Sequence, residues 1–492
     1  MENKKKHIVG FYVDERKRDM KNIKKDPPKR IEAVKLPKKV KLLYSVGEIS
    51  KGILNITPIM FCLYFYVNVL GISSSVAATV MLISKIWDII NDPIMGAIVD
   101  RTHSKEGKCR VWLKYVSLPG GIAFALTFMM PAIGGVWKIV WIAITYTLQS
   151  MAGTAFLIPA NTLCGRLTSD PVERASMNQY KGFINLIPNL CVTGLTMPLV
   201  LLFGGENNMQ RGFLCVGILY GIFYALGVFC VYIGTRGYEP VEEIKEKKQV
   251  EIKEKHVSAG SGLKVLIKNN YWLFTLGMYF VYMLSTSIAT ACMTFYCQYN
   301  LGNVGLASAV SVILLLSGLV VYSVLGKFVK RFGNARTAVI GCIIGILGYA
   351  VRFVLHDTNM VVVMFGIVLI GFSSSLVSGV IVLCIFDSAV YGEWKTGVNS
   401  EAILMSGYSV SYKTGQALGS PIAGYILALV PFVANAAKQE KSVLNVLFLQ
   451  STLLPLIGVV ISLVCAISLV KYEKQIPKIQ KEMEARKSSV TE

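Results

Sequence analysis

The chain has 492 residues, of which 53% are hydrophobic and only 16% are charged, whereas soluble domains carry about 25% charged residues. Several stretches without any Asp, Glu, Lys or Arg are longer than the roughly 20 apolar residues that span a bilayer, among them residues 52–84, 269–326 and 358–386. This composition excludes a water-soluble enzyme and predicts an integral membrane protein that crosses the bilayer many times.

The N-terminal tail, residues 1–42, is strongly basic. Residues 1–41 hold fifteen Lys or Arg and six Asp or Glu, so we expect the tail to be attracted to anionic lipid headgroups; a tail that binds a partner protein is the alternative. The net charge of +21 would suit nucleic-acid binding in a soluble protein. Because the basic residues lie in tails and short loops between apolar segments, membrane topology explains them better, and no nucleic-acid partner is expected.

About twelve apolar segments follow, each long enough to span the membrane. They predict an all-α fold of two six-helix bundles, residues 43–235 and 264–471, joined by a cytoplasmic linker at 236–263 and followed by a cytoplasmic tail at 472–492. The expected spans are 43–70, 75–100, 112–133, 137–165, 183–204, 212–234, 269–299, 304–328, 337–356, 360–387, 402–431 and 445–470.

Corresponding loops in the two halves resemble each other. Each contains a glycine and a basic cluster, which are Gly96, Arg101, Lys105, Lys108 and Arg110 after the second span and Gly326, Lys327, Lys330, Arg331 and Arg336 after the eighth. The short turns on the opposite side carry no basic residue, so the basic loops and both termini are predicted to face the cytoplasm. The repeat predicts two parallel halves that rock around a site near the midplane.

The second span carries acidic residues, which are costly inside a membrane and mark function. Asp88 and Asp92 are four residues apart, so both carboxylates lie on one helix face with Asn91 beside them. A cation between them, Na⁺ or a proton, would relieve their mutual repulsion, and oxygen ligands suit hard cations. The pattern predicts a cation site; structural ion pairs with basic residues elsewhere are the alternative.

The eleventh span supplies a positive charge, Lys413, in an otherwise uncharged segment that also holds Ser409. A lysine at this depth is expected to face the interior and to pair with an acid, and Asp88 or Asp92 from the other half is the obvious candidate. Such a pair, formed when the cation is absent, would couple cation occupancy to conformation. A purely structural bridge is the alternative.

Polar residues in further spans predict a cavity for a sugar-like substrate, which many neutral donors and acceptors with an aromatic platform would recognise. The candidates on the first and fourth spans are Glu48, Lys51, Asn55, Tyr146, Thr147, Gln149, Ser150, Thr154 and Asn161, and the fifth and seventh spans add Asn185, Asn189, Ser285, Thr286, Ser287 and Thr290. Two alternatives remain: Glu48 and Lys51 pair only with each other, and the hydroxyl groups hold neighbouring helices together.

Charged residues near the ends of spans predict a cytoplasmic gate. Glu393 and Lys395, between the tenth and eleventh spans, are expected to pair with the basic loops, including the loop that Asp100 and Arg101 enter. Such pairs would close the cytoplasmic side in one state. An ordinary solvated loop at residues 387–397 is the alternative.

The chain resembles the glycoside–pentoside–hexuronide:cation symporter family of the major facilitator superfamily, which includes melibiose permease. The resemblance runs from about Leu43 to about Val470. It rests on these segments: 87–96 (WDIINDPIMG), 107–112 (GKCRVW), 173–174 (ER), 391–397 (YGEWKTG) and 413–415 (KTG). It implies that Asp88 and Asp92 are cation-site carboxylates, Asn91 a cation-selectivity position, Thr147 a cation-site threonine and Lys413 the basic partner.

The sequence departs from melibiose permease where that carrier holds its galactoside. Gly52 and Gly182 stand where the resemblance would place an Asp and an Arg, Ser150 or Met151 stands for a second Asp, and Val390 replaces a further Asp. The coupling residues are therefore kept while the galactoside-binding residues are not. Another glycoside, a pentoside, a uronide or an oligosaccharide is as good a candidate substrate.

These observations predict a secondary active transporter of the cell membrane, monomeric and without a cofactor, that carries a sugar or glycoside together with Na⁺ or H⁺. The first alternative is a sodium-coupled carrier of a lysolipid or another amphiphile, and the second is a non-transporting membrane sensor. No phosphate-binding loop, nucleophile elbow or zinc-binding helix motif is present in the sequence, so an enzyme is not expected.

Overall fold

The computed structural model describes residues 36–168, 171–205, 207–239, 269–356, 359–396, 401–436 and 438–491, and these residues form helices, turns and loops without a β-strand. The first 35 residues of the basic tail and most of the predicted linker, from residue 240 on, lie outside the described residues. The predicted all-α membrane fold is confirmed. In the described residues, eight helices are long and apolar enough to cross a membrane.

The helices fall into two groups. The first group comprises α2 (Lys38–Ser45), α3 (Gly47–Thr57), the π-helical turns η1 (Pro58–Cys62) and η2 (Phe65–Val69), α4 (Ser74–Arg101), α5 (Arg110–Thr127), α6 (Val136–Leu167), α7 (Pro171–Gly204) and α8 (Met209–Gly234). The second comprises α10 (Asn270–Tyr299), α11 (Leu306–Phe332), α12 (Asn334–Val354), α13 (Met360–Thr396), α14 (Glu401–Leu427), α15 (Lys441–Ser451), α16 (Leu453–Glu473) and α17 (Ile476–Thr491). When α3 to η2 and α15 with α16 each count as one, the described residues supply twelve membrane-length segments.

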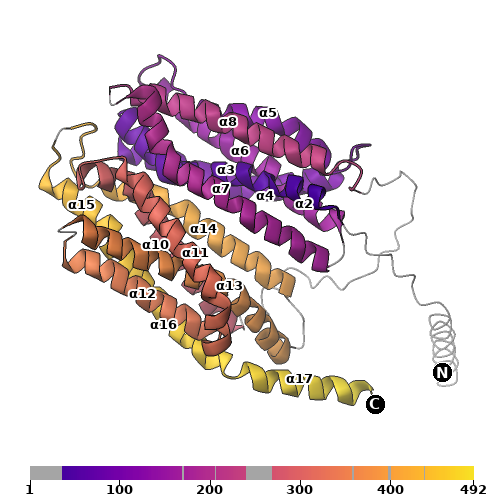
Figure 1. Cartoon of the computed structure of the whole chain (residues 1–492). Helices are drawn as coiled ribbons and strands as arrows, with labels where there is room; N and C mark the ends of the chain where they lie inside the picture. Colours follow the sequence, from indigo (N-terminus) through magenta and orange to yellow (C-terminus); the bar gives the residue numbers. More distant parts are fainter. Residues whose placement is uncertain are drawn as a thin grey trace, which may run out of the picture.

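Each group packs mainly on itself, and Figure 1 shows the two bundles one above the other. In the first bundle α5 packs against α6 and α8, and α3 packs against α7 and α8; in the second, α12 packs against α13 and α16, and α10 packs against α14 and α16. The bundles meet where α4 contacts α14, α7 contacts α11 and α10 contacts η1. The structure therefore places the helix with the two aspartates against the helix with the lysine.

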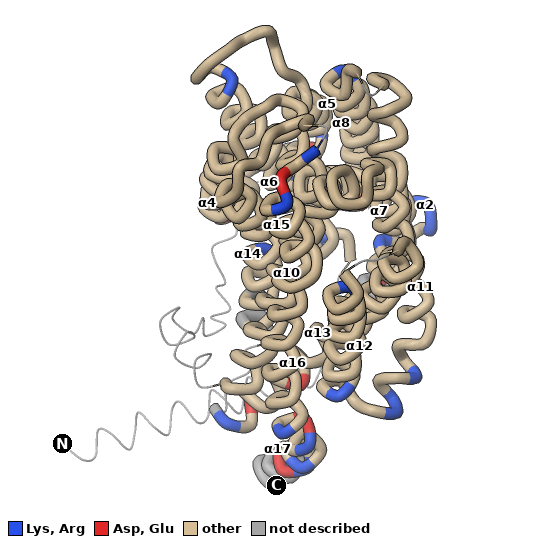
Figure 2. Tube along the Cα trace, turned by 90° about the vertical axis from the view of Figure 1, so that its left-hand side faces the viewer, with Lys and Arg blue, Asp and Glu red and all other residues tan. Residues whose placement is uncertain are grey.

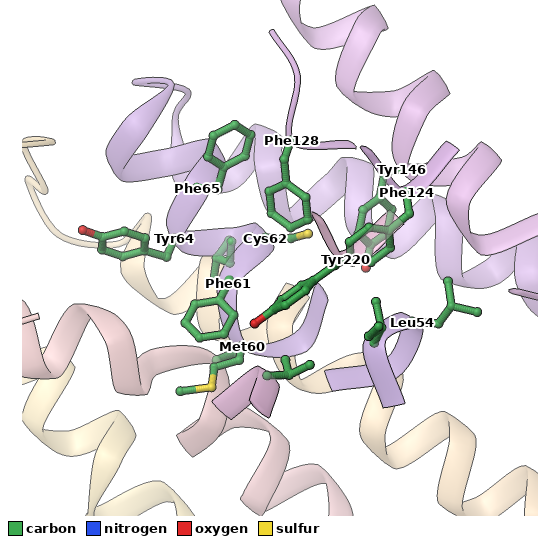
Figure 3. Packing of buried hydrophobic residues seen from close by; sticks show 14 of the residues in the cluster. Leu54, Met60, Phe61, Cys62, Tyr64, Phe65, Phe124, Phe128, Tyr146 and Tyr220 are labelled. Carbon is green, nitrogen blue, oxygen red and sulfur yellow. The ribbon is translucent and has the colours of Figure 1, made fainter. Parts of the chain in front are cut away.

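The first span is a continuous helix that contains two π-helical segments. Pro58 begins η1, and a second π-helical turn follows at Phe65. The widened turns put successive aromatic rings into the core of the first bundle, where the ring of Phe65 lies 5.4 Å from that of Phe128 and 5.0 Å from that of Phe213. Figure 3 shows Phe61, Cys62, Phe65 and Phe128 packed around this segment.

The tenth span is longer than predicted, and the alternative of a solvated loop at residues 387–397 is wrong for the part that the structure describes. Helix α13 continues to Thr396. The physical reason is aromatic burial, because the rings of Tyr391 and Tyr472 lie 5.4 Å apart and Trp394 donates a hydrogen bond to Glu482 of α17 at 2.9 Å. Helical geometry keeps both rings on the face that contacts α16 and α17.

The internal repeat has a structural counterpart at the basic loops. Glu239 accepts hydrogen bonds from the backbone N–H groups of Cys109 (3.0 Å) and Arg110 (3.1 Å) at the start of α5. Glu473 accepts from the N–H groups of Asn334 and Ala335 at the start of α12, the latter at 3.0 Å. Both carboxylates complement the positive end of a helix dipole. The two halves thus repeat a contact as well as a sequence pattern.

Candidate functional site

The two aspartates of α4 share one partner. The Thr154 hydroxyl of α6 lies 3.0 Å from Asp88 Oδ1 and 2.9 Å from Asp92 Oδ1. A hydroxyl has a single hydrogen to donate, so it satisfies one carboxylate at a time and leaves the other in need of a proton or a cation. The arrangement concentrates negative charge around one oxygen donor at the inner face of the first bundle.

Lys413 reaches this pair from the second bundle. Its Nζ lies 2.6 Å from Asp92 Oδ2, and the side chains of Lys413 and Asp92 are 57% and 27% exposed. An ion pair with this much exposure is screened by solvent, so it can open at modest cost. Because Lys413 belongs to α14 and Asp92 to α4, forming or breaking this contact acts directly on how the two bundles sit against each other.

Two further residues of the predicted cation site lie nearby. Asn91 is half-buried on α4 beside the carboxylates. The Thr147 and Ser84 hydroxyls hydrogen-bond each other at 2.8 Å, one turn before Asp88. The two carboxylates share the hydroxyl of Thr154, which the sequence analysis named only as part of the polar set of the fourth span. Thr154 lies seven residues after Thr147 on the same face of α6, and a cation-site role for Thr147 stays a prediction.

Two of the predicted substrate residues form a local ion-pair cluster instead of an open cavity wall. Glu48 is 6% exposed and its carboxylate contacts Lys51 Nζ at 2.9 Å and Lys181 Nζ at 3.2 Å. The space beside them is only about 20 Å³, which is room for about one water molecule and far too small for a sugar. The structure therefore favours the ion-pair alternative for Glu48 and Lys51.

The other predicted substrate residues are scattered. Tyr146 is buried in the core of the first bundle (Figure 3). Its ring is edge-on to that of Tyr66, with the ring centres 6.3 Å apart. Asn55 is half-buried on α3, Ser150 is buried on α6 and Ser409 is exposed on α14. None of these residues lines the large cavity described below.

The predicted gate residues lie on α4 and α13, two helices that do not pack extensively against each other. Asp100 and Arg101 end α4, which packs against α6 and α14. Glu393 and Lys395 are in the last turns of α13, which packs against α10, α11, α12, α14 and α17. Lys395 Nζ lies 5.6 Å from the ring centre of Tyr391. A gate built from these residues stays a prediction.

A cavity of about 440 Å³ lies where α7 faces the second bundle. Its polar lining includes Asn185, Asn189 and Thr193 of α7, Thr286 and Thr290 of α10, and Ser311 of α11. Four of the six amide and hydroxyl residues that the sequence predicted on the fifth and seventh spans are among them, whereas Ser285 and Ser287 are not.

A second cavity of about 150 Å³ connects this region to α14. It shares Ile56, Thr286 and Thr290 with the larger cavity and reaches Gln416, which lies three residues from Lys413. The two cavities therefore share polar, uncharged groups, and the larger one has the size range of small-molecule binding sites.

Comparison with known proteins gives one family. The model of the family described as MFS/sugar transport protein matches residues 43–473. The isoprimeverose transporter of Lactiplantibacillus pentosus is 27% identical over 90% of this chain and 90% of its own. The inner membrane symporter YicJ and the glucuronide carrier protein homolog of Escherichia coli (strain K12) are 26% and 25% identical, covering 87% and 82% of this chain and 90% and 86% of theirs.

Solved structures show the same fold. A bacterial homolog of the human lysosomal transporter Spinster, in an inward-facing and unoccupied conformation, aligns with a TM-score of 0.62 at 13% identity and covers 90% of this chain and 97% of its own. The tetrameric transporter PepTSo2 aligns with a TM-score of 0.61 at 14% identity, covering 90% and 99%.

Proposed function

Because this chain belongs to the MFS/sugar transport protein family, and with it to the glycoside–pentoside–hexuronide:cation symporters of the major facilitator superfamily, we propose that it moves a sugar or glycoside together with Na⁺ or H⁺. It is a multi-pass membrane transporter of the MFS type. The observation that carries the coupling proposal is the contact of Lys413 with Asp92 across the two bundles, beside a second carboxylate that shares Thr154 with the first.

The proposed coupling follows from charge balance. With the site empty, Lys413 neutralises one of the two carboxylates. A cation that binds between Asp88 and Asp92 supplies the same positive charge and competes with the ammonium group. Its binding releases Lys413, which frees α14 from α4 and lets the halves rearrange around a bound solute.

Hydrogen bonds between the two bundles at the end near α15 support an arrangement in which this end is closed. The side-chain amide of Asn68 in η2 donates to Gln298 at 3.0 Å and to Asn435 at 3.1 Å, and Thr79 of α4 hydrogen-bonds Tyr425 of α14 at 2.8 Å. All join the first bundle to the second. Figure 2 views this end; apart from a few charged residues beside α15, most of the trace that faces the viewer around it is tan. We propose that it faces outward and that both termini are cytoplasmic in the cell membrane.

The test is uptake into vesicles that contain the purified chain, under imposed Na⁺ or H⁺ gradients, with a panel of radiolabelled sugars. The parent chain is expected to accumulate a sugar against its gradient, and Asp92→Asn is expected to lose uphill accumulation by at least tenfold. Glu440→Gln, which neutralises an exposed carboxylate at the start of α15, is the matched control and is expected to behave like the parent.

Uphill transport by Asp92→Asn at the parent rate contradicts the proposal. A lysolipid probe in the same assay tests the amphiphile alternative, which the apolar residues in the lining of the 440 Å³ cavity, such as Leu186, Leu314 and Leu315, favour. Gradient-driven lysolipid uptake without sugar uptake would establish that alternative.

A further inference from the structure

A second pair of carboxylates lies at the end of the second bundle opposite α15, where α16 leads into α17 (Figure 1). Asp387 belongs to α13, and Glu473 is the last residue of α16. Asn334, the first residue of α12, contacts both. Its Nδ2 donates to Asp387 Oδ2 at 2.7 Å, and its backbone N–H donates to Glu473 Oε1. Two acidic side chains are therefore held around a single asparagine.

The corresponding contact in the first bundle is neutralised by an arginine. Glu239 caps α5 as Glu473 caps α12, and Arg166 of α6 lies 3.2 Å from the Glu239 carboxylate. Helix α6 is the fourth span, and its counterpart in the second half is the tenth span, α13. That helix supplies Asp387, an acid, where the first half has a cation. The repeated contact therefore lacks one positive charge in the second bundle and carries one additional carboxylate.

The surroundings of Asp387 and Glu473 do not compensate this charge. Among the described residues, no Lys, Arg or His lies within 4.0 Å of either carboxylate. The titratable groups that face the pair are Tyr271 of α10 and Cys384 of α13, and the described residues of α11, α14 and α17 place no basic group within that distance. Both carboxylates are half-buried. Two neighbouring negative charges without a counter-ion are unfavourable in such a place.

Two polar atoms beside the pair have no hydrogen-bond partner among the described residues. Tyr271 is fully buried, and its hydroxyl lies beside the Asp387 carboxylate without the geometry of a hydrogen bond. Asn334 Oδ1 is a buried atom and is also unpartnered. Buried polar atoms in proteins nearly always have a partner. Because an amide oxygen can only accept, the partner of Asn334 Oδ1 has to supply a hydrogen.

We propose that Asp387 and Glu473 form a proton-binding site, with the proton carried on Asp387, separate from the proposed cation site on α4. A carboxylic acid and an amide can join through two hydrogen bonds, one from the amide N–H to the acid and one from the acid O–H to the amide oxygen. Asn334 already makes the first of these bonds with Asp387. A proton taken from solvent onto the other Asp387 oxygen supplies the second, to Asn334 Oδ1, and removes one of the two negative charges.

The proton binds where the end of the tenth span is held in place. The pair and its asparagine join α12, α13 and α16. Beyond Asp387 on α13, Tyr391 packs against Tyr472 of α16, and Trp394 donates to Glu482 of α17. Loss of the proton restores the repulsion between α13 and α16 and weakens the packing of this end. Because this is the end that we propose to be cytoplasmic, the site makes the packing of α13 respond to cytoplasmic pH.

The first test measures stability against pH. The melting temperature of the full chain in detergent is recorded from about pH 6 to about pH 9 for the parent, for Asp387→Asn and for the control Glu440→Gln. The folded parent holds a proton that the unfolded chain has released, so its stability falls as the pH rises. Relative to Asp387→Asn, which keeps a neutral group at this position, the parent and the control are expected to lose about 3 °C. Equal pH dependence in the parent and Asp387→Asn overturns the proposal.

A second variant and an infrared spectrum test the same site in other ways. Glu473→Gln keeps an oxygen acceptor for the N–H groups of α12 but removes a charge. Because the remaining acid then holds its proton less tightly, the midpoint of the stability loss is expected to move down by about one pH unit. The infrared difference between the parent and Asp387→Asn at neutral pH is expected to contain the band of a protonated carboxyl group. An unchanged midpoint, or a difference spectrum without that band, overturns the proposal.

Sodium ions distinguish a proton from a metal ion at this site. If Na⁺ at constant pH raises the melting temperature of the parent but not that of Asp387→Asn, the site holds a metal ion and the proton assignment is wrong. If Na⁺ acts equally on both chains, it binds elsewhere and the proton assignment stands. None of these measurements uses transport, so a failure of this proposal and a failure of coupled transport are distinguishable.

Discussion

At the scale of single residues, the central fact is that one hydroxyl serves two carboxylates. Thr154 lies within hydrogen-bond distance of both Asp88 and Asp92, yet it has one hydrogen. The unmatched carboxylate is what makes a bound cation favourable at this place. Lys413 meets the same need from the other bundle, which is why we propose that the ammonium and the cation compete.

We predict that Thr154→Val weakens cation binding about tenfold while Thr147→Val has a smaller effect, because Thr154 contacts both carboxylates and Thr147 contacts Ser84. The loss corresponds to about 1.4 kcal/mol, close to the lower end of the range for a hydrogen bond to a charged group. The measurement is the Na⁺ and H⁺ dependence of sugar uptake for both variants. A larger effect of Thr147→Val would shift the site to the position that the family resemblance implied.

A residue-level prediction about pH concerns the loop between α4 and α5. The pKa of Glu106 is lowered because Lys114 and Tyr232 hydrogen-bond its charged carboxylate, each at 2.8 Å. The contact therefore supports the folded loop above the ordinary pKa of 4.5 and is lost as the pH falls through the lowered value. Hydrogen-exchange protection of residues 104–114, corrected for intrinsic rates, should decline only below pH 4.5.

Glu106→Gln should remove that pH dependence while leaving the loop otherwise folded. A decline in protection that begins above pH 4.5 in the parent chain, or one that persists in the variant, would show that another group controls the loop.

At the scale of elements, interrupted and capped helices position the site. The first span contains the π-helical segments η1 and η2, and the twelfth breaks between α15 and α16; irregular helices are common where transporters hold their substrates. Both irregular segments lie beside the larger cavity, since Met60 of η1 and Ser451 line it. The helix starts at the basic loops, by contrast, are capped by the carboxylates of Glu239, which is buried, and Glu473, which is half-buried.

We predict that Glu239→Ala destabilises the chain by about 3 kcal/mol, the cost of breaking a buried ion pair. Glu239 is fully buried, contacts Arg166 at 3.2 Å and caps α5. Glu440→Ala, which removes a carboxylate at the exposed start of α15, should change stability little. Denaturant unfolding in detergent measures both variants, and equal effects would show that the cap of α5 contributes nothing specific.

At the scale of the whole molecule, contacts between the bundles at two depths, one within the helices and one at the end near α15, act on one equilibrium. The Lys413–Asp92 pair joins the bundles near the carboxylates, and the Asn68 cluster joins them at the end near α15. The Tyr299 hydroxyl and the Asn435 backbone N–H both donate to Asn68 Oδ1 as well. In a transporter that opens alternately to each side, such contacts set the relative population of the two states.

We predict that Asn68→Ala shifts the chain toward the state open at the α15 end, because it removes the side-chain contacts of η2 with Gln298 and Asn435. A population shift of about tenfold corresponds to roughly 1.4 kcal/mol. The measurement is labelling of single cysteines placed on Ser73 and Asn300, with Ser323→Ala of α11 as a control remote from the cluster. Unchanged labelling in Asn68→Ala would mean that the cluster does not hold this end closed.

The sequence by itself determined that this is an all-α membrane protein, and it determined the number of spans. The reason is that an uncharged stretch of membrane length has few alternatives to a helix in lipid. It also determined that Asp88 and Asp92 share a face, since a spacing of four residues fixes that in any helix. It indicated the polar residues of the fifth and seventh spans, although not which of its many polar residues face one cavity.

Only the tertiary structure decided which groups from different helices meet. Lys413 pairs with Asp92 rather than Asp88, and the hydroxyl of Thr154, not that of Thr147, contacts the two carboxylates. Glu48 and Lys51 form an ion pair that Lys181 joins, and Tyr146 is buried in the core. The rotation of each helix about its axis is set by packing against its neighbours, and hydrophobic periodicity is weak evidence for it in a membrane, where lipid and core are equally apolar.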